Sequence, residues 1–541
     1  MKMRKFTAWA AILLLAVTLC ACGAPEPGNV PDAPLQELIA LDTSGLGNVM
    51  LMDADSNGTY AAMLYMRYEN GDEQGYGLSL FDLRTNTEIR RLELADATYD
   101  GYDVSVTDAG VCVGRQMAAT QTLYDFNLEN PVTSAYAYTD GYELASAMDA
   151  IDVGRVQCFP NFAVSLDNCD YRVLAFYDRP DRLYLLKPNQ YYEYKAANGH
   201  QVLLVDNSGN QIEDYRSVVR ILDFDRQTEV AAITIPNNYP FNNLEGTLKL
   251  NDKCAVIATV NETEFDTLYV WNYGQSVKNL PLDADFLETV AVDQIESKTE
   301  EVCLRIKETT GVTVTCAPEM AFIQWYCISN DVKPIEFYCA ALELEQYLLL
   351  LPKETYQEIL CRDLTDPVAS FDDFRIYLVG YFRAGDVVAY EANVSCDETD
   401  HQHIEYIVYS CYDFTRQTFF HELMHAFEYR IWNYESKFDK NWEALNPKGF
   451  RYSDDYVSVF YDEANRDWQE YFAWAYGMKS ILEDRATCFE ALCDGMLGGS
   501  TWWKEIPQLM AKQQYLAQTV RKSFPSLQGA AILQIEEIFK S

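Results

Sequence analysis

The chain has 541 residues, 49% of them hydrophobic, which predicts two to four globular domains with cores of ordinary size. Its 82 acidic residues outnumber the 42 basic ones and give a formal net charge of −40. This charge argues against nucleic acid or anionic lipid as the main partner, because few cations are present to neutralise phosphates; it suits an exposed protein and a cationic substrate.

The first residues predict export and a lipid anchor. A basic start, MKMRK, precedes an apolar run over 6–19 that is too short to cross a bilayer comfortably. The letters LCAC at 19–22 resemble a bacterial lipobox, which predicts a lipoprotein signal peptide over 1–22 and a diacylglycerol on Cys22; an ordinary secretory signal is the alternative. Residues 23–38 begin with a proline-rich stretch and predict a tether. We therefore expect the protein outside the cell, at the face of a bacterial membrane, with the lipid as its only membrane contact.

Residues 39–285 predict an all-β domain, because short runs of Val, Tyr, Leu and Thr alternate with Asn, Asp and Gly turns. A weak pattern of apolar strand, polar turn and second strand recurs at intervals of about 45 residues. Its third positions are Asp82, Asp125, Asp178, Asp223 and Val270. This repeat resembles β-propeller blades, with a β-sandwich as the alternative. His200 stands alone near a turn and is expected to face solvent.

From Phe286 onward the pattern predicts a mixture of helices and strands. The expected elements are a helix, a strand, a helix and three strands, over 286–311, 312–316, 340–359, 374–382, 387–390 and 404–409. A further helix is expected to begin at Asp413 as its N-cap. Residues 502–541 predict a helical end with a break at Pro525.

The stretch FFHELMHAF over 419–427 matches H-E-x-x-H and holds two of the five histidines of the chain. On a helix, His421 and His425 share one face and could bind one Zn²⁺, with Glu422 as general base toward a water on the metal. The alternatives are a surface helix with a histidine pair, or a site that has lost its metal. His401 and His403, in the acidic loop DETDHQH, are interpreted as solvated loop residues.

Zinc requires a third protein ligand as well as an open position for water. No third histidine follows at metzincin spacing, which leaves Glu470 and Glu483 as candidates. Glu483 has a competing interpretation, because Ser480 to Glu483 also forms an S-x-x-E capping box at a helix start.

The segments WEALNPKGFRY (442–452) and YFAWAYGMKSILEDRATCFEAL (471–492) are similar to clostridial-type secreted metallopeptidases, which distantly resemble lethal-factor-type gluzincins. Phe472, Tyr476 and Glu483 fall in the register of that family's F-x-x-x-Y-A and E-D-x-A motifs. The resemblance implies that Glu483 is the third zinc ligand and that Tyr476 donates a hydrogen bond to the oxyanion. The family often has an acid four residues after the glutamate, where this chain has Thr487.

Together these features predict a multidomain protein with an all-β, propeller-like domain over 39–285 and an α+β zincin metallopeptidase domain over 286–541. The predicted function is that of a surface-anchored zinc peptidase acting on peptide or protein substrates. One Zn²⁺ would be held by His421, His425 and Glu483, with Glu422 and Tyr476 as catalytic residues. The alternative is a cell-surface protein whose β-domain binds a protein or glycan and whose zincin domain is inactive.

Overall fold

A computed structural model divides the chain into two compact units, Met1–Ala137 with Phe241–Val277 and Tyr138–Pro240 with Lys278–Ser541. The structure describes residues 37–536 except 70–71, 95–101, 116–118, 136–155, 160, 166–170, 187–191, 207–215, 237–248, 262–263, 276–277, 283–285, 319–327, 362–370, 383–388, 395–403 and 413. The predicted signal peptide with Cys22, most of the tether, His401, His403 and Asp413 lie outside these residues.

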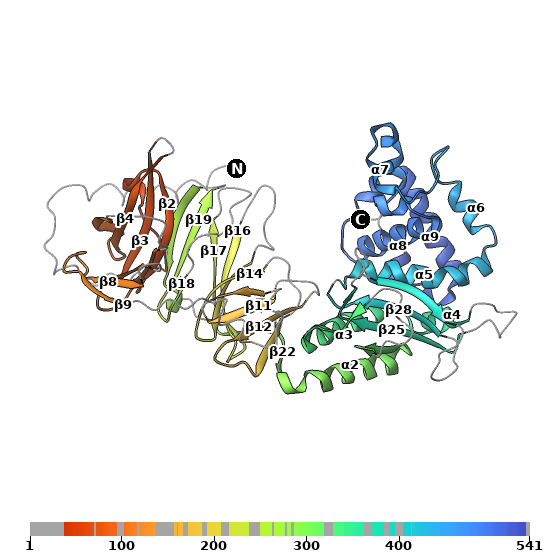
Figure 1. Cartoon of the computed structure of the whole chain (residues 1–541), viewed down its shortest axis with the longest axis horizontal. Helices are drawn as coiled ribbons and strands as arrows, with labels where there is room; N and C mark the ends of the chain where they lie inside the picture. Colours follow the sequence, from red (N-terminus) through yellow and green to blue (C-terminus); the bar gives the residue numbers. More distant parts are fainter. Residues whose placement is uncertain are drawn as a thin grey trace, which may run out of the picture. The chain divides into compact units, whose positions relative to one another are not determined.

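The β-rich part of the described chain consists of antiparallel sheets in which mostly consecutive strands lie side by side, as in propeller blades (Figure 1). The first unit contains β1 Leu38–Ala40, β2 Val49–Ser56, β3 Tyr60–Glu69, β4 Asp72–Asp82, β5 Thr87–Leu94, β6 Tyr102–Val106, β7 Val111–Arg115, β8 Thr120–Tyr124, β9 Val132–Ala135, β18 Lys249–Leu250, β19 Ala255–Asn261 and β20 Glu264–Trp271. The second contains β10 Val156–Cys158, β11 Phe162–Ser165, β12 Arg172–Phe176, β13 Arg182–Leu186, β14 Tyr192–Asn198, β15 Gln201–Asp206, β16 Arg216–Asp223, β17 Thr228–Pro236, β21 Leu280–Pro281 and β22 Phe286–Ala291. The predicted all-β, propeller-like character of the N-terminal region is confirmed.

The repeated sequence pattern marks the end of one strand in each of these sheets. Its positions lie in or just after β4, β8, β12, β16 and β20. Asp82 accepts a hydrogen bond from the Arg84 amide at 2.9 Å, and Asp223 accepts one from the Arg226 amide at 2.9 Å. Aspartates that bond to the following backbone in this way start tight turns, which explains why the repeat carries Asp. The β18–β20 sheet gains its fourth strand from β1, at the start of the chain.

Buried carboxylates join neighbouring sheets within the first unit. Asp53 and Asp55 of β2 accept hydrogen bonds at 2.6 Å from the backbone amides of Val104 and Val106 in β6. Lys249 of β18 donates to Asp53 at 2.8 Å. A carboxylate is stable in this buried position because it receives charge-assisted hydrogen bonds.

His200 was expected to face solvent, and this prediction is wrong. Its Nδ1 lies 2.9 Å from Asp225 and its Nε2 lies 3.1 Å from Asp178, while its ring packs against Phe176 with centroids 4.6 Å apart. Only 12% of its side chain is exposed. The histidine links a turn of the β10–β13 sheet to two turns of the β14–β17 sheet, a long-range arrangement that the local sequence does not reveal.

This contact predicts a pH-dependent contribution to stability. Burial lowers the pKa of His200, but the hydrogen bonds and charges of Asp225 and Asp178 outweigh burial and raise it. The stabilisation is therefore full below the unfolded pKa of about 6.5 and is lost as the pH rises through the higher folded pKa. At pH 5.5 we expect the free energy of unfolding of wild type to exceed that of His200→Gln by up to about 1 kcal/mol, the usual limit for a partly solvated ion pair. Thermal unfolding of both chains from pH 5.5 to 9 measures this; a difference that does not shrink with rising pH contradicts the prediction.

The C-terminal part contains a mixed sheet in the order β23-β25-β28-β27. Strands β23 Thr313–Cys316, β25 Asp373–Val379 and β28 Ile404–Ser410 are parallel, and the edge strand β27 Ala389–Val394 is antiparallel to β28. Two short strands from the same region, β24 Ile328–Ser329 and β26 Tyr381–Phe382, form a separate antiparallel pair. The strands predicted over 312–316 and 404–409 are present within one residue of these bounds. The strand predicted over 374–382 is divided into β25 and β26, and the one predicted over 387–390 extends four residues further, to Val394.

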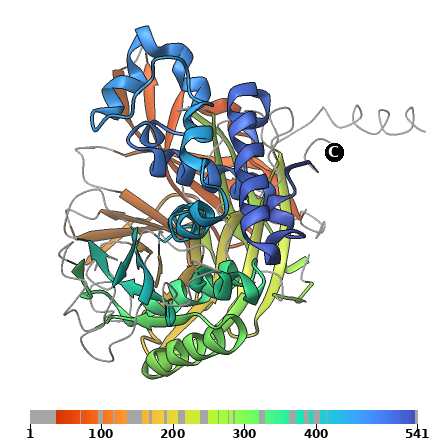
Figure 2. The same ribbon diagram turned by 90° about the vertical axis from the view of Figure 1, so that its right-hand side faces the viewer.

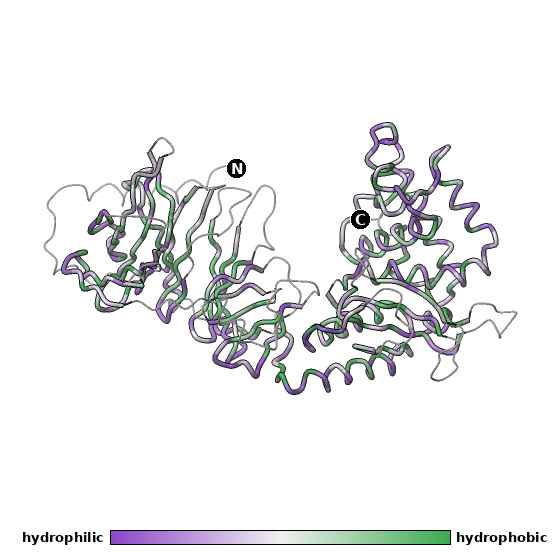
Figure 3. Tube along the Cα trace, in the orientation of Figure 1, coloured by the Kyte–Doolittle hydropathy of each residue, from purple (hydrophilic) through white to green (hydrophobic). Residues whose placement is uncertain are grey.

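The helix predicted over 286–311 begins later than expected. Residues 286–291 form β22, which pairs with β13, and α2 spans Ile295–Thr310 with Gly311 as a left-handed C-cap at φ 84°. The helix predicted over 340–359 is in fact two helices, α3 Pro334–Leu348 and α4 Lys353–Leu360. Pro352 separates them, because a proline disfavours the helical conformation of the residue before it. Along α2, hydrophobic and hydrophilic residues alternate, as expected for a helix with one buried face (Figure 3).

The remaining helices are α5 Arg416–Tyr434, α6 Phe438–Glu443, α7 Tyr456–Tyr461, α8 Ile481–Met496 and α9 Pro507–Ser523, with 3-10 turns at Glu463–Tyr471, Ala475–Met478, Trp502–Glu505, Pro525–Leu527 and Ala531–Leu533. Helix α9 ends just before Pro525, as predicted. Helices α5, α8 and α9 pack against one another (Figures 1 and 2). None of the helices in the described part of the chain has the length and apolar character needed to span a membrane.

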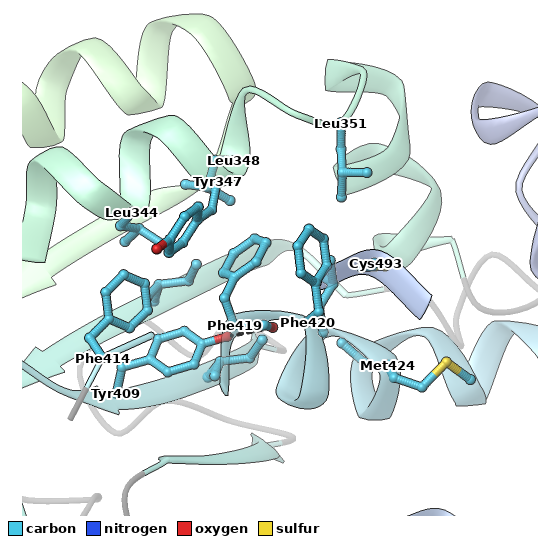
Figure 4. Packing of buried hydrophobic residues seen from close by; sticks show 14 of the residues in the cluster. Leu344, Tyr347, Leu348, Leu351, Tyr409, Phe414, Phe419, Phe420, Met424 and Cys493 are labelled. Atoms are coloured by element: carbon cyan, nitrogen blue, oxygen red, sulfur yellow. Dashed lines mark hydrogen bonds between the residues drawn. The ribbon is translucent and has the colours of Figure 1, made fainter. Parts of the chain in front are cut away.

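Aromatic packing fixes the orientation of α5. Phe419 and Phe420 are fully buried and point toward α3 and the segment after it (Figure 4). The ring of Phe419 lies 5.6 Å from that of Tyr347, and the Tyr409 hydroxyl donates to the Phe419 carbonyl at 3.1 Å. Phe420 also packs against Phe489 of α8, with ring centroids 6.1 Å apart, so aromatic contacts hold α5 against both α3 and α8.

Nine cysteines of the described chain are free thiols. The sulfurs of Cys303 and Cys316 lie 3.9 Å apart, within hydrogen-bonding distance of each other.

Candidate metal centre

The first turn of α5 is fixed by a local cap. The Thr415 hydroxyl accepts from the Thr418 amide, and the Thr418 side chain bonds back to the Thr415 amide, which forms a capping box. The helix therefore starts with Thr415 as its N-cap rather than at the predicted Asp413. His421 and His425 are spaced by one turn of this helix, and their ring centroids lie 5.1 Å apart.

Helix α8 supplies the third group. Ser480 caps this helix by accepting from the Glu483 amide at 3.2 Å, so this part of the capping-box interpretation is correct. The Glu483 side chain nevertheless reaches the histidines: its Oε2 lies 3.0 Å from His421 Nε2 and 3.5 Å from His425 Nε2. Ligand atoms of all three residues lie within 4.8 Å of one another. The backbone and the side chain of Glu483 thus serve different purposes.

A buried network holds the start of α8 in place. The Asp484 carboxylate accepts from Lys512 Nζ at 2.7 Å, from the Trp442 indole at 2.8 Å and from the Tyr452 hydroxyl at 2.8 Å. The next residue, Arg485, is also fully buried and donates to Glu428 of α5 at 2.7 Å through two nitrogens. These ion pairs tie α8 to α9 and α5, and so position Glu483 opposite the histidines.

Glu490 is a site residue that the sequence reasoning missed. Its Oε2 lies 2.9 Å from His421 Nδ1, the ring nitrogen that faces away from Glu483. A carboxylate at this place fixes the tautomer and orientation of a metal-binding histidine. The position four residues after Glu483, where the resembling family often has an acid, is Thr487, whose hydroxyl donates to the Asp484 carbonyl. The usable signal was the spacing of seven residues, which also keeps two side chains on one face of a helix.

Tyr476 lies directly beside Glu483. Its hydroxyl donates to Glu483 Oε1 at 3.0 Å and accepts from Lys479 Nζ at 2.9 Å. Burial and the charge of Glu483 raise the pKa of Tyr476 well above its usual value, so the hydroxyl remains a proton donor at neutral pH. Lys479, a second residue missed from sequence, adds a positive charge 3.7 Å from Glu483.

Glu422 follows His421 directly on α5, and its side chain is buried. Burial raises its pKa, the charges of His421 and His425 lower it, and those of Glu483 and of Glu391 in the edge strand β27 raise it. A carboxylate with a raised pKa can both take up and release a proton near neutral pH.

His421 and Glu483 form a charged pair, and their pKa values are shifted in opposite directions. Burial lowers the pKa of His421, but its bonds with Glu483 and Glu490 raise it to about 10. Burial raises the pKa of Glu483, whereas the histidines bring it well below its usual range. Burial also lowers the pKa of His425, but its hydrogen bond with Glu483 outweighs burial and raises it. The cluster therefore combines an ionised carboxylate with two imidazoles, a set of groups that can bind a cation when the imidazoles give up their protons.

The rival third ligand, Glu470, lies elsewhere. It accepts a hydrogen bond from Gln508 at 3.0 Å and does not belong to the cluster of His421, His425 and Glu483. In the part of the chain that the structure describes, that cluster is the set of His, Cys, Asp and Glu residues whose spacing suits a metal ion.

Comparisons with known proteins add little to this geometry. No protein-family model and no curated protein matches the chain. Among solved structures, Hsv2 from Kluyvelomyces marxianus matches with 9% identity, covering 42% of this chain and 73% of its own, at a TM-score of 0.20. The β-propeller domain of Cps50 (Swd1) from Myceliophteria thermophila matches with 11% identity, 41% and 83% coverage and a TM-score of 0.19. The β-propeller domain of the Trilobed protease from Pyrococcus furiosus matches with 10% identity, 42% and 81% coverage and a TM-score of 0.17. Scores this low carry no argument about function.

Proposed function

We propose that the chain is a zinc-dependent peptidase, anchored by lipid on Cys22 at the outer face of a bacterial cell membrane. The observation that carries the proposal is the meeting of His421 and His425 from α5 with Glu483 from α8, within 4.8 Å of one another. One Zn²⁺ would be held by these three residues. The all-β region would then present or position the peptidase part.

The spacing of the donors fits zinc. Two ligands that each lie ~2.0–2.1 Å from a tetrahedral ion are separated by about 3.3 Å. The observed separations from Glu483 Oε2 are 3.0 Å to His421 Nε2 and 3.5 Å to His425 Nε2. Two imidazoles and one carboxylate form a donor set typical of catalytic zinc, and Glu490 supports His421 from behind.

When bound, zinc supplies a Lewis acid and lowers the pKa of a water ligand toward about 7. Glu422 takes the proton of the attacking water and passes it to the leaving amine, a role that suits its burial and raised pKa. The Tyr476 hydroxyl keeps its proton and donates a hydrogen bond to Glu483 Oε1 in the structure; in the reaction it turns to donate this hydrogen bond to the oxygen that becomes negative.

The edge strand β27 supports a peptide as the substrate. It forms one edge of the mixed sheet in the described chain, and it packs against α5, which carries the histidines. An extended peptide can pair with the open edge of such a strand through main-chain hydrogen bonds. The intact donor set and this strand favour a peptidase over a binding protein with an inactive metal domain.

The test uses the full chain loaded with zinc and a mixture of unstructured peptides. We expect about one zinc per chain, internal cleavage of peptides, and loss of both in Glu483→Ala. Metal analysis and mass spectrometry of the peptides measure these outcomes. A wild-type chain that holds zinc without cleaving any peptide, or that holds no zinc, overturns the proposal.

The support of His421 by Glu490 leads to a second prediction. Glu490→Gln keeps the size of the side chain but removes the negative charge that makes the imidazole a better ligand, so we expect zinc affinity to fall about 10- to 100-fold. Competition with a chelator measures the affinity. Glu505→Gln, an exposed change in the turn after α8, is the matched control; equal affinities in the two variants contradict the role given to Glu490.

A further inference from the structure

Two cysteines face each other where helix α2 packs against strand β23. Cys303 lies in the middle of α2, and Cys316 is the last residue of β23. Their sulfur atoms are 3.9 Å apart, and both residues are partly exposed. This thiol pair, Cys303 with Cys316, therefore lies at the edge of the hydrophobic core rather than deep inside it.

The backbone that carries the thiol pair is held in place from both sides. Val302 of α2 and Val314 of β23 are buried in the same hydrophobic core. Gly311 turns the chain from the helix to the strand, and its amide donates to the Lys307 carbonyl at 3.0 Å. Lys307 Nζ also lies 3.6 Å from the carboxylate of Asp373 in β25, the strand that pairs with β23. The two sulfurs therefore meet because the helix and the strand are both fixed.

Other thiols of the described chain have contacts of a different kind. The sulfurs of Cys112, Cys254, Cys411 and Cys488 each lie beside an oxygen acceptor, at 3.7, 3.5, 3.5 and 3.9 Å. Contacts of this kind are ordinary for small, partly or fully buried thiols. In the thiol pair the neighbour of each sulfur is another sulfur, which is the arrangement that can become a covalent bond.

The two thiols differ in acidity. The hydrogen bond with Cys316 lowers the pKa of Cys303, although burial and the charge of Glu300 oppose this shift. The same hydrogen bond, burial and the charge of Cys303 and of Cys411 raise the pKa of Cys316 well above its usual value. Since the thiolate is the nucleophile in disulfide exchange, Cys303 is the residue suited to attack first.

We propose that Cys303 and Cys316 are a modification site that closes to a disulfide bond once the protein is outside the cell. The inference goes beyond the peptidase function and rests on the predicted export, because disulfides form and persist in oxidising surroundings. A bond of ~2.05 Å requires the sulfurs to approach by about 2 Å, a distance within the range of moderate rotations about the two Cα–Cβ bonds.

The oxidant is a disulfide compound. The Cys303 thiolate attacks one of its sulfurs, forms a mixed disulfide and releases the first thiolate, which takes up the proton that Cys303 gave to solvent. The Cys316 sulfur then attacks Cys303 Sγ, and the second sulfur of the oxidant leaves with the proton of Cys316. Two electrons pass from the thiol pair to the oxidant, which is reduced to two thiols.

The bond would close residues 303–316 into a loop and fasten α2 to the mixed sheet. Helix α2 directly follows β22, the strand that pairs with β13, so the bond would secure the start of the C-terminal part of the chain. A loop of this size restricts the unfolded chain enough to raise the unfolding midpoint of that part by about 5–10 °C.

The test uses the full chain, purified in reducing buffer and then equilibrated with reduced and oxidised glutathione. Alkylation and mass spectrometry count the free thiols and identify linked peptides, and thermal unfolding is recorded before and after oxidation. Reduced wild type is the reference, so the comparison requires no substitution. Cys303→Ser and Cys316→Ser each remove one sulfur of the pair. Cys411→Ser is the matched control, because Cys411 is another cysteine whose charge acts on Cys316.

We expect wild type and Cys411→Ser to form the 303–316 link and to gain about 5–10 °C on oxidation. In Cys316→Ser, glutathione should accumulate on Cys303, whereas in Cys303→Ser it should react more slowly with Cys316. A wild-type chain that keeps both thiols free, or that links Cys316 to Cys411, overturns the inference. A link that leaves the midpoint unchanged overturns its stabilising role. Because the oxidant is added to purified protein, these failures are distinct from a failure of export or of the peptidase function.

Discussion

Replacing Glu422 with Gln is expected to abolish most peptide cleavage while leaving the zinc content unchanged. The substitution keeps the size of a buried side chain but removes the carboxylate that we propose accepts the proton from water. General acid–base catalysis of this kind contributes about 10²–10⁴-fold to a rate, so kcat/KM should fall by that factor. Cleavage of one unstructured peptide, normalised to bound zinc, measures the effect.

A matched control is available on the same helix segment. Glu435→Gln makes the same chemical change at the C-terminal cap of α5, ten residues after His425, where the carboxylate bonds to Lys522. It should retain wild-type activity. If Glu422→Gln cleaves peptides as fast as Glu435→Gln, then Glu422 is not the general base and the mechanism is wrong.

The fold of the N-terminal region could be predicted because its signals are local. The apolar strands, the Asp-containing turns and their spacing are all written within short segments, and they locate the sheets correctly. Two features escaped because they depend on distant pairing. Strand β1 completes a sheet whose other strands lie more than 200 residues later, and β22 adds to the β10–β13 sheet although it follows the β21 strand of another sheet.

The site could be predicted to a similar depth. The spacing of His421 and His425 on one helix is a local signal, and the Tyr476–Glu483 register came from resemblance. The structure brings these residues together, whereas their chemical roles remain predictions. The Glu490 carboxylate was missed because its importance arises only when α8 lies against α5. The same holds for the ion pairs of Asp484 and Arg485, which look from sequence like ordinary charges on a helix surface.

Those ion pairs lead to the largest stability effect that the structure predicts. Lys512 and Asp484 are both completely buried, and the lysine makes two bonds to the carboxylate, at 2.7 and 2.9 Å. Lys512→Met preserves most of the side-chain volume but leaves the Asp484 charge without its cation, a change that costs about 3–5 kcal/mol in buried pairs. The unfolding midpoint of the C-terminal part in urea should fall accordingly, and zinc affinity should fall with it because Asp484 adjoins Glu483.

The control and the rescue distinguish lost pairing from general damage to α9. Lys522→Met changes a lysine with 61% of its side chain exposed on the same helix, and should leave the midpoint nearly unchanged because its partner Glu435 is at the surface. The double variant Asp484→Asn with Lys512→Met removes both charges, so it should recover part of the stability lost in the single variant. A double variant that is less stable than Lys512→Met by the full cost of Asp484→Asn alone would show that the two residues act independently. In that case the pair would not be what fixes α8, and the position of Glu483 would have to depend on Arg485 and Glu428 instead.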